Sequence, residues 1–235
     1  MPTPLSIPVG ALVRERPARA QFFDRYSVDY CCGGARTLEE ACHAAGADAD
    51  EVLTGLQAFD ATPAAVVEPD LGALSVEALL DHILETHHVY LKEELEALGA
   101  LVEKVSVRHG NAHPELHEVT TVYSGLAAEL AMHLRKEEEI LFPAIRALAA
   151  GDTPTGPGCG VEGPVRVMEL EHEEAGAALA RLRELTDDYR PPDDACNSWR
   201  AMLDRLARLE ADTHRHIHKE NCVLHPQALA LAGAR

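Results

Sequence analysis

The chain has 235 residues, of which 46% are hydrophobic but only 4% aromatic. Alanine, leucine and glutamate dominate, and this balance favours helices packed on helices over a sheet-based core, so we expect an all-α fold. The net charge of −18 repels nucleic acid phosphates and anionic lipids, so we expect neither a nucleic acid partner nor a membrane partner.

The sequence also indicates a compartment. Its N-terminal residues lack the basic start and apolar centre of a signal peptide, and no apolar run approaches the roughly 20 residues that span a bilayer. The six cysteines are scattered apart from one adjacent pair, unlike the disulfide framework of a secreted domain. We therefore expect a cytoplasmic protein.

Residues 1–60 predict a small helical domain. Thr37 and Glu40 have the spacing of a capping box, which marks a helix start. Before this helix, the adjacent Cys31 and Cys32 are followed by two glycines, which predict a turn. A thiol on a turn beside a helix start tends to have a lowered pKa.

Residues 61–74 contain two prolines among small and β-branched residues and predict a linker. Beyond it, glycine- and proline-containing segments separate stretches of helical periodicity. Short connections between such helices are typical of an up-down-up-down four-helix bundle, which we expect over residues 75–235. The expected helices cover residues 75–108, 115–149, 164–189 and 194–223.

The buried seam of each expected helix contains a histidine. A bundle buries residues at alternating spacings of three and four, and Ile140 is among the seam positions of the second helix. The second and fourth helices add a glutamate one turn after the histidine. Because neighbouring helices are antiparallel, these side chains fall at one level to within about one turn. The converging set is His88, His133, Glu137, His172, His216 and Glu220.

This set predicts a metal centre. Burying two carboxylates without cations would cost several kcal/mol each. Imidazoles mixed with carboxylates suit iron, manganese or zinc better than calcium or magnesium, and the ligands are too many for one tetrahedral zinc. We expect two metal ions bridged by Glu137 and Glu220, each with two histidines.

Two other histidines deserve comparison with this set. His87 is only 100° around the helix from His88 and is its one competitor as a ligand. His225, next to Pro226, is turned roughly 140° from Glu220. For His225 we expect solvent exposure or a contact with a ligand rather than metal ligation.

Ligating imidazoles are usually oriented by a further hydrogen bond. Glu129 lies one turn before His133, and Glu171 directly precedes His172, so both are candidates for this role. For Glu171 a place on an exposed acidic face is the alternative. Tyr123 falls near the same layer, and we expect it to be a core residue.

Four stretches together resemble one known family, the repair-of-iron-centres di-iron proteins. These are bacterial iron–sulfur cluster repair proteins with a hemerythrin-like bundle behind a small cysteine-containing domain, and the resemblance covers nearly the whole chain. One departure is His225, because the family pattern at this position resembles the phenylalanine of Leu141-Phe142-Pro143. The stretches are Asp29-Tyr-Cys-Cys-Gly-Gly34, His133-Leu-Arg-Lys-Glu-Glu-Glu-Ile-Leu-Phe-Pro143, Glu171-His-Glu-Glu-Ala-Gly176 and His216-Ile-His-Lys-Glu-Asn-Cys-Val-Leu-His-Pro226.

The resemblance implies two non-haem irons with four terminal histidines and two bridging glutamates. It also implies restoration of iron–sulfur clusters damaged by nitric oxide or peroxide, so damaged iron–sulfur proteins would be partners and nitric oxide or dioxygen a small ligand. A nitric oxide reductase type of reaction is the enzymatic activity to consider. The alternatives are a hemerythrin-type carrier or sensor without turnover, and an iron store. The implied terminal ligands are His88, His133, His172 and His216, and the implied bridges are Glu137 and Glu220.

The cysteines leave two interpretations open. Adjacent cysteines cannot easily chelate one metal together, and a disulfide between neighbours is strained. Either one of Cys31 and Cys32 packs while the other is idle, or the pair supplies a redox-active or transiently iron- or nitric-oxide-binding thiol, as the resemblance implies. Cys159 has no counterpart required by the family. Dimerisation through the N-terminal domain is compatible with the sequence.

Overall fold

The computed structural model describes residues 4–61, 71–153 and 160–233. These residues form helices, turns and loops without a strand, which confirms the all-α prediction. They divide into two compact units, Met1–Asp81 with Ile145–Thr153 and His214–Arg235, and His82–Ala144 with Pro154–Thr213. None of the described helices combines the length and apolar character that a membrane span requires.

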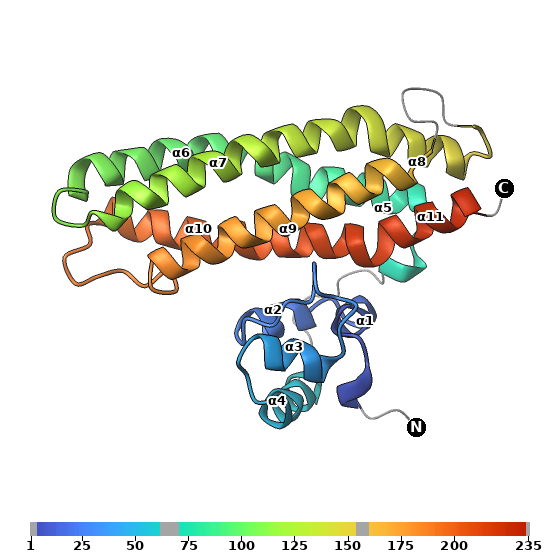
Figure 1. Cartoon of the computed structure of the whole chain (residues 1–235), viewed down its shortest axis with the longest axis horizontal. Helices are drawn as coiled ribbons and strands as arrows, with labels where there is room; N and C mark the ends of the chain where they lie inside the picture. Colours follow the sequence, from blue (N-terminus) through green and yellow to red (C-terminus); the bar gives the residue numbers. More distant parts are fainter. Residues whose placement is uncertain (1–3, 62–70, 154–159, 234–235) are drawn as a thin grey trace. The chain divides into compact units, whose positions relative to one another are not determined.

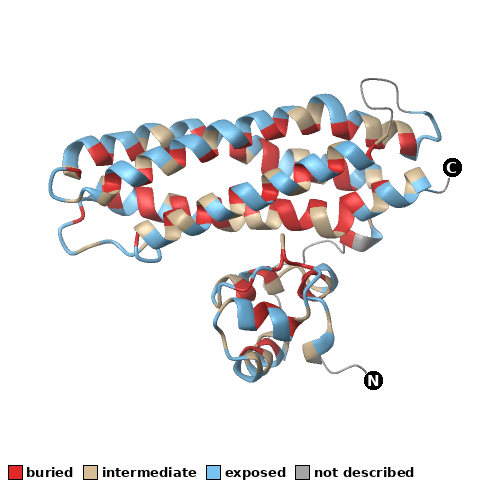
Figure 2. Cartoon of the chain, viewed as in Figure 1, coloured by how far each residue is buried: buried red, intermediate tan, exposed pale blue. Residues whose placement is uncertain are grey.

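The second unit contains the main part of a helical bundle. Its helices α6 (Val89–His109), α7 (Glu115–Lys136), α9 (Glu162–Leu185) and the first part of α10 (Asn197–Lys219) run side by side (Figure 1). Each turns a stripe of buried residues inward (Figure 2). The stripe recurs every three or four residues, which is the helical period. On α6 it consists of Leu91, Leu95, Leu98, Val102 and Val105.

The first unit contains a small helical core. Its N-terminal elements are η1 (Pro4–Ser6), α1 (Val9–Glu15), α2 (Arg19–Asp24), α3 (Leu38–Ala44) and α4 (Ala49–Ala61). Helix α3 begins with the predicted capping box, in which Thr37 accepts from the Glu40 amide and Glu40 accepts from the Thr37 amide. Phe22, Phe23 and Tyr30 fill the core between these helices.

Further elements complete the two units. They are the 3₁₀ turn η2 (Leu71–Ala73), α5 (Val76–Ile83), α8 (Phe142–Ala149) and α11 (His225–Gly233). Most of the predicted linker at 61–74 lies outside the described residues, as does Cys159.

Three predicted helix boundaries are wrong. The third long helix ends at Leu185 rather than 189, because Asp187, Asp188 and Tyr189 adopt positive φ angles that no right-handed helix contains. The fourth begins at Asn197 and does not end at 223, because α11 carries it on to Gly233 through Pro226. A widened turn before this proline relieves the clash of its ring with the preceding turn.

Candidate metal centre

Three π-helical turns interrupt the long helices, and each carries a predicted ligand. His88 ends η3 (Leu84–His88), Glu137 begins η4 (Glu137–Leu141), and Glu220 begins η5 (Glu220–Leu224). A π turn inserts one residue into the helical repeat and is frequent at functional sites.

The inserted residue shifts the helix register beyond each turn. Ile140, which the sequence pattern assigns to the seam, is 51% exposed, whereas Leu141 is buried. The seam prediction is therefore wrong after Glu137. Its physical reason is the π turn, because a regular repeat of 3.6 residues no longer holds there.

Within the second unit, four of the predicted ligands lie together. His88, His133, Glu137 and His172 are each at most 2% exposed. One carboxylate oxygen of Glu137 lies 3.4 Å from Nε2 of His88, and the other lies 3.1 Å from Nε2 of His133. Nε2 of His172 lies 3.0 Å from Nε2 of His133. A single carboxylate thus faces two different imidazoles with its two oxygens.

The outer nitrogens of two of these imidazoles have carboxylate partners. Nδ1 of His88 donates to Glu138 at 2.8 Å, and Glu138 also accepts from Lys92 at 2.7 Å. Burial alone would raise the pKa of Glu138, but the hydrogen bonds from Lys92 and His88 lower it below its ordinary value. Glu138 is therefore an anion at neutral pH, and it fixes the His88 ring with Nε2 pointing inward.

His133 has a matching arrangement. Its Nδ1 donates to Glu171 at 2.9 Å, and Lys136 forms an ion pair with the same carboxylate. Burial would raise the pKa of Glu171, but hydrogen bonds from Lys136 and His133 lower it. Glu171 thus orients an imidazole, as expected, although its partner is His133 on α7 and not the neighbouring His172. Glu129, the other candidate, is exposed.

The donor set fits a metal cation. With Nδ1 of His133 donating to Glu171, a neutral ring turns the lone pair of Nε2 toward a carboxylate oxygen of Glu137 and toward Nε2 of His172. Lone pairs that face one another at about 3 Å repel unless a proton or a metal ion lies between them. Imidazole nitrogens and a carboxylate are suitable ligands for iron, manganese or zinc.

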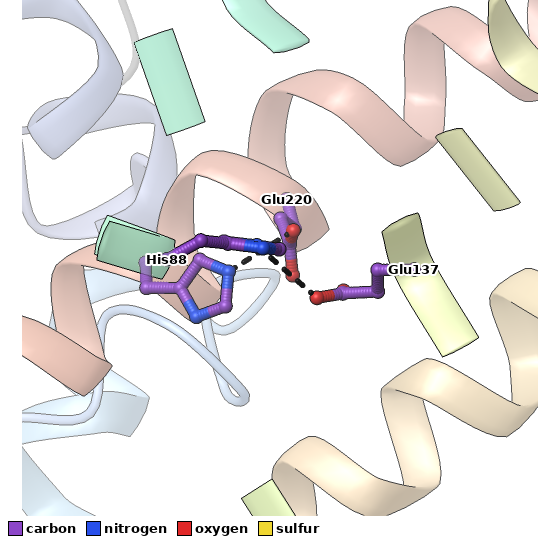
Figure 3. A group of neighbouring side chains, drawn as sticks. His88, Glu137 and Glu220 are labelled. Carbon is purple, nitrogen blue, oxygen red and sulfur yellow. Dashed lines mark ion pairs between the residues drawn. The ribbon is translucent and has the colours of Figure 1, made fainter. Parts of the chain in front are cut away.

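In the first unit, the other two predicted ligands form a pair of the same kind. Nε2 of His216 lies 3.2 Å from a carboxylate oxygen of Glu220, and both residues are at most 1% exposed. They are one turn apart where α10 passes into η5. This repeats the relation of His133 and Glu137. Figure 3 labels His88, Glu137 and Glu220 among these buried side chains.

His87 and His88 have different partners. Nδ1 of His87 lies 3.0 Å from a carboxylate oxygen of the partly buried Asp212, so His87 takes part in a separate hydrogen bond. His225 is 0% exposed, which excludes the solvent-exposed alternative and leaves the contact with a ligand as the expectation. Tyr123 is a core residue as expected, and its hydroxyl donates to the carbonyl of Leu95 at 2.7 Å.

A small pocket of about 110 Å³ opens beside His133 in the second unit. Its apolar lining residues include Leu130 and Met132, and its charged lining residues are Glu129, Lys136, Glu171 and Glu174. The pocket is large enough for a diatomic molecule or a water. His133 forms part of its wall.

The cysteine pair lies on a turn of the first unit. Sγ of Cys31 donates to Asp29 at 3.3 Å and lies 3.9 Å from Sγ of Cys32. The hydrogen bond with Cys32 and burial raise the pKa of Cys31 well above its ordinary value. The expected lowering is wrong for Cys31, because α3 begins only at Leu38 and the thiol is buried beside an acidic group.

The sequence did not indicate the hydrogen-bond partners of His88 and His87. Glu138 follows Glu137 directly and looks like an ordinary surface glutamate, and Asp212 is 125 residues from His87. The one local signal is the spacing of Asp212, one turn before His216.

Comparison with known proteins matches both parts of the chain. Residues 79–228 match the hemerythrin HHE cation binding domain, and residues 6–60 match a domain of unknown function, ScdA_N. The iron-sulfur cluster repair protein YtfE of Enterobacter sp. (strain 638) is 35% identical over 223 residues, which cover 95% of this chain and 96% of that protein.

The corresponding proteins of Salmonella schwarzengrund (strain CVM19633) and Escherichia coli O1:K1 are each 34% identical over the same coverage. Similarity of this extent, together with the hemerythrin domain and its buried histidines, confirms the resemblance seen in the sequence. The chain belongs to the family of YtfE-type iron–sulfur cluster repair proteins.

Proposed function

We propose that this protein repairs iron–sulfur clusters damaged by nitrosative or oxidative stress, and that it holds two non-haem iron ions to do so. The proposed repair activity is the one stated in the names of its relatives. The observation that supports two ions is Glu137, whose two oxygens face different imidazoles. The proposed terminal ligands are His88, His133, His172 and His216, and the proposed bridges are Glu137 and Glu220.

The side chains would each have a definite task in this centre. Ferrous iron held there would supply coordination positions for nitric oxide or dioxygen and a source of iron for a damaged cluster. Glu138 and Glu171 hold two of the rings and increase their basicity. The pocket beside His133 admits a small ligand, while the buried seam excludes bulk water.

The cysteine pair and the domain plan belong to the same proposal. Cys31 and Cys32 would provide the thiol that binds iron or nitric oxide, or changes redox state, during repair. We assign them to a small domain at residues 1–60, joined by a linker at 61–74 to the di-iron bundle at 75–235. The clients would be damaged iron–sulfur proteins of the cytoplasm.

Iron content tests the metal assignment. Protein loaded anaerobically should contain about two irons per chain, and His133→Ala and Glu137→Ala should each remove iron, because each takes away a buried donor. Glu139→Ala is the matched control, since Glu139 is exposed and pairs only loosely with Arg135 at 3.9 Å. Unchanged iron in the first two variants would contradict the assignment.

A repair assay tests the function. A [4Fe–4S] enzyme inactivated by nitric oxide should recover activity with the diferrous protein and not with Glu137→Ala. The nitric oxide concentration is measured in the same reaction. Iron delivery leaves nitric oxide in solution, whereas binding or reduction of nitric oxide by the protein removes it. A hemerythrin-type carrier would bind dioxygen reversibly and restore no enzyme activity, and that result would overturn the proposal.

A further inference from the structure

A group of converging metal-ligand atoms lies on the turn of the first unit that carries the cysteine pair. Sγ of Cys31 lies 3.3 Å from Oδ1 of Asp29 and 3.9 Å from Sγ of Cys32. The carboxylate oxygen and the two sulfurs all lie within 4.8 Å of one another. These three side chains are different from the proposed ligands of the bundle, and they belong to the motif Asp29-Tyr-Cys-Cys-Gly-Gly34.

The turn explains how two adjacent cysteines can face one ion. In an extended chain, successive side chains point to opposite sides, which makes joint chelation difficult. Here the backbone folds back, because residues 32–35 form a turn and the amide of Gly34 donates to the carbonyl of Cys31 at 3.4 Å. The two sulfurs therefore lie close together, contrary to the expectation from their adjacency in the sequence.

The carboxylate of Asp29 is held in place by the backbone of the same turn. Its Oδ1 accepts from the amide of Cys31 at 3.1 Å, and its Oδ2 accepts from the amide of Gly33 at 2.8 Å. A Cβ atom at Gly33 would lie 2.8 Å from Oδ2, so a larger residue there would displace the carboxylate. The first glycine after the cysteine pair thus keeps a ligand oxygen beside the sulfurs.

The spacing of the three atoms fits a tetrahedral ion. Bonds of about 2.3 Å to sulfur and about 2.1 Å to oxygen place two sulfurs about 3.8 Å apart and a sulfur about 3.6 Å from an oxygen. The observed distances of 3.9 and 3.3 Å are close to both values. The thiol proton that Cys31 donates to Asp29 lies where the ion would bind. An ion can therefore take the place of this proton without a rearrangement of the turn.

Cys32 gives the group access to solvent. Cys31 is 5% exposed, whereas Cys32 is only partly buried. A structural zinc ion has four protein ligands in a closed site, and a site with three protein ligands leaves one position open. An ion bound at this turn would therefore keep one position for a water or an incoming ligand, and it would exchange with solution.

We propose that Sγ of Cys31, Sγ of Cys32 and Oδ1 of Asp29 together bind one divalent ion that prefers thiolates, Fe²⁺ or Zn²⁺. This deepens the thiol role proposed above and rests on it, because it makes both cysteines ligands of one ion and adds a carboxylate to them. Each thiol loses its proton to solvent as its sulfur binds the ion. Thiolate ligands select Fe²⁺ or Zn²⁺ over magnesium and calcium.

The test uses the full-length, iron-loaded protein under anaerobic conditions, titrated with Co²⁺. Co²⁺ lies above Fe²⁺ in the affinity order of divalent ions, so it displaces exchangeable iron from the turn. Sulfur ligands give an intense thiolate-to-cobalt absorption, and the proposed bundle ligands contain no sulfur. We expect this absorption to saturate at one Co²⁺ per chain. Cys31→Ser and Cys32→Ser should each weaken binding by at least about 100-fold, because a lost ligand costs more than a lost supporting residue.

Asp29→Asn tests the carboxylate as a ligand. Asparagine retains an oxygen that can accept from the amide of Cys31 but lacks the negative charge. Co²⁺ should bind at least about tenfold more weakly, while the thiolate absorption at saturation stays the same because both sulfurs remain. The matched control is Cys222→Ser, since this sulfur lies 3.9 Å from the carbonyl oxygen of Tyr30 on the same turn without belonging to the set. Weaker binding in Cys222→Ser, or unchanged affinity in Asp29→Asn or Cys32→Ser, would overturn the proposal.

Alkylation of the unaltered protein gives an answer even where a variant fails to fold. Added Zn²⁺ should slow the alkylation of Cys31 and Cys32 in parallel and leave the exposed Cys196 unchanged in peptide mass spectra, because a thiolate bound to an ion no longer attacks the reagent. Protection of Cys32 without Cys31 would contradict the shared ion. Glu137→Ala should lose bundle iron and keep the cobalt absorption, whereas Cys32→Ser should do the reverse. Failure of the bundle assignment and failure of this site therefore give different results.

Discussion

Replacing Glu138 by glutamine tests whether the bundle orients the proposed metal ligands. Glu138 is an anion that accepts from Nδ1 of His88 at 2.8 Å. Glutamine retains an oxygen that can accept the same hydrogen bond but removes the negative charge. The ion pair with Lys92 contributes little by itself, because that lysine is 53% exposed and such pairs are worth at most about 1 kcal/mol.

The expected magnitude follows from the role of the carboxylate. Loss of a carboxylate behind a ligating histidine costs about 10- to 100-fold in metal affinity, and the retained hydrogen bond places Glu138→Gln near the lower end. A tenfold loss is about 1.4 kcal/mol, which lowers the melting temperature of the iron-loaded protein by about 3–6 °C. The metal-free protein should melt within about 2 °C of the original.

Competition with a chromophoric iron chelator measures the effect directly. Because Glu138 contacts His88 and not His133, one of the two proposed irons should bind about tenfold more weakly, and the isotherm should separate into two steps. Glu171→Gln is the matched variant on the His133 side. Equal weakening of both irons by Glu138→Gln, or no weakening, would refute the reasoning.

Three further changes have different expected results. Tyr123→Phe removes the bond to the carbonyl of Leu95 and should cost about 1 kcal/mol in urea unfolding without changing iron content; a loss of iron would contradict its core role. The hydrogen bond between His113 and Asp194 raises the pKa of His113 and lowers the pKa of Asp194. Asp194→Asn should therefore lower the melting temperature near pH 5.5, where both side chains are charged. It should leave the melting temperature unchanged near pH 9, where His113 is neutral. An equal effect at both pH values would exclude this ion pair as its cause. Gly125 lies at an exposed position of α7, and an added Cβ would have no atom within 4 Å apart from its own stretch of helix. Gly125→Ala should therefore stabilise the protein by about 0.5–1 kcal/mol in the same urea assay, and destabilisation would reveal a contact at this position.

The helical fold and the positions of the candidate ligands could be predicted because both depend on local periodicity. An apolar stripe repeats along each helix whatever its neighbours are, and a histidine within the stripe is therefore buried with it. His133, His172 and His216 are all buried as this pattern requires. The capping box at Thr37 is equally local, since it involves residues only three apart.

The partners of these ligands could not be predicted, because they come from other helices. Glu138 meets His88 across 50 residues of sequence, and Glu171 meets His133 across 38. No spacing within one helix indicates such pairs. The contact of His87 with Asp212, across 125 residues of sequence, is equally invisible in the spacing of one helix.

The helical class, the family and the set of buried histidines and glutamates follow from the sequence, because the hydrophobic period and the motifs depend on residues close together in the chain. The register beyond Glu137 depends on the folded structure, where a π turn buries Leu141 in place of Ile140. The folded structure also places Cys222 and His218 against the turn that carries the cysteine pair. These contacts join residues nearly two hundred positions apart, and only the packing of one helix against another chain segment brings them together.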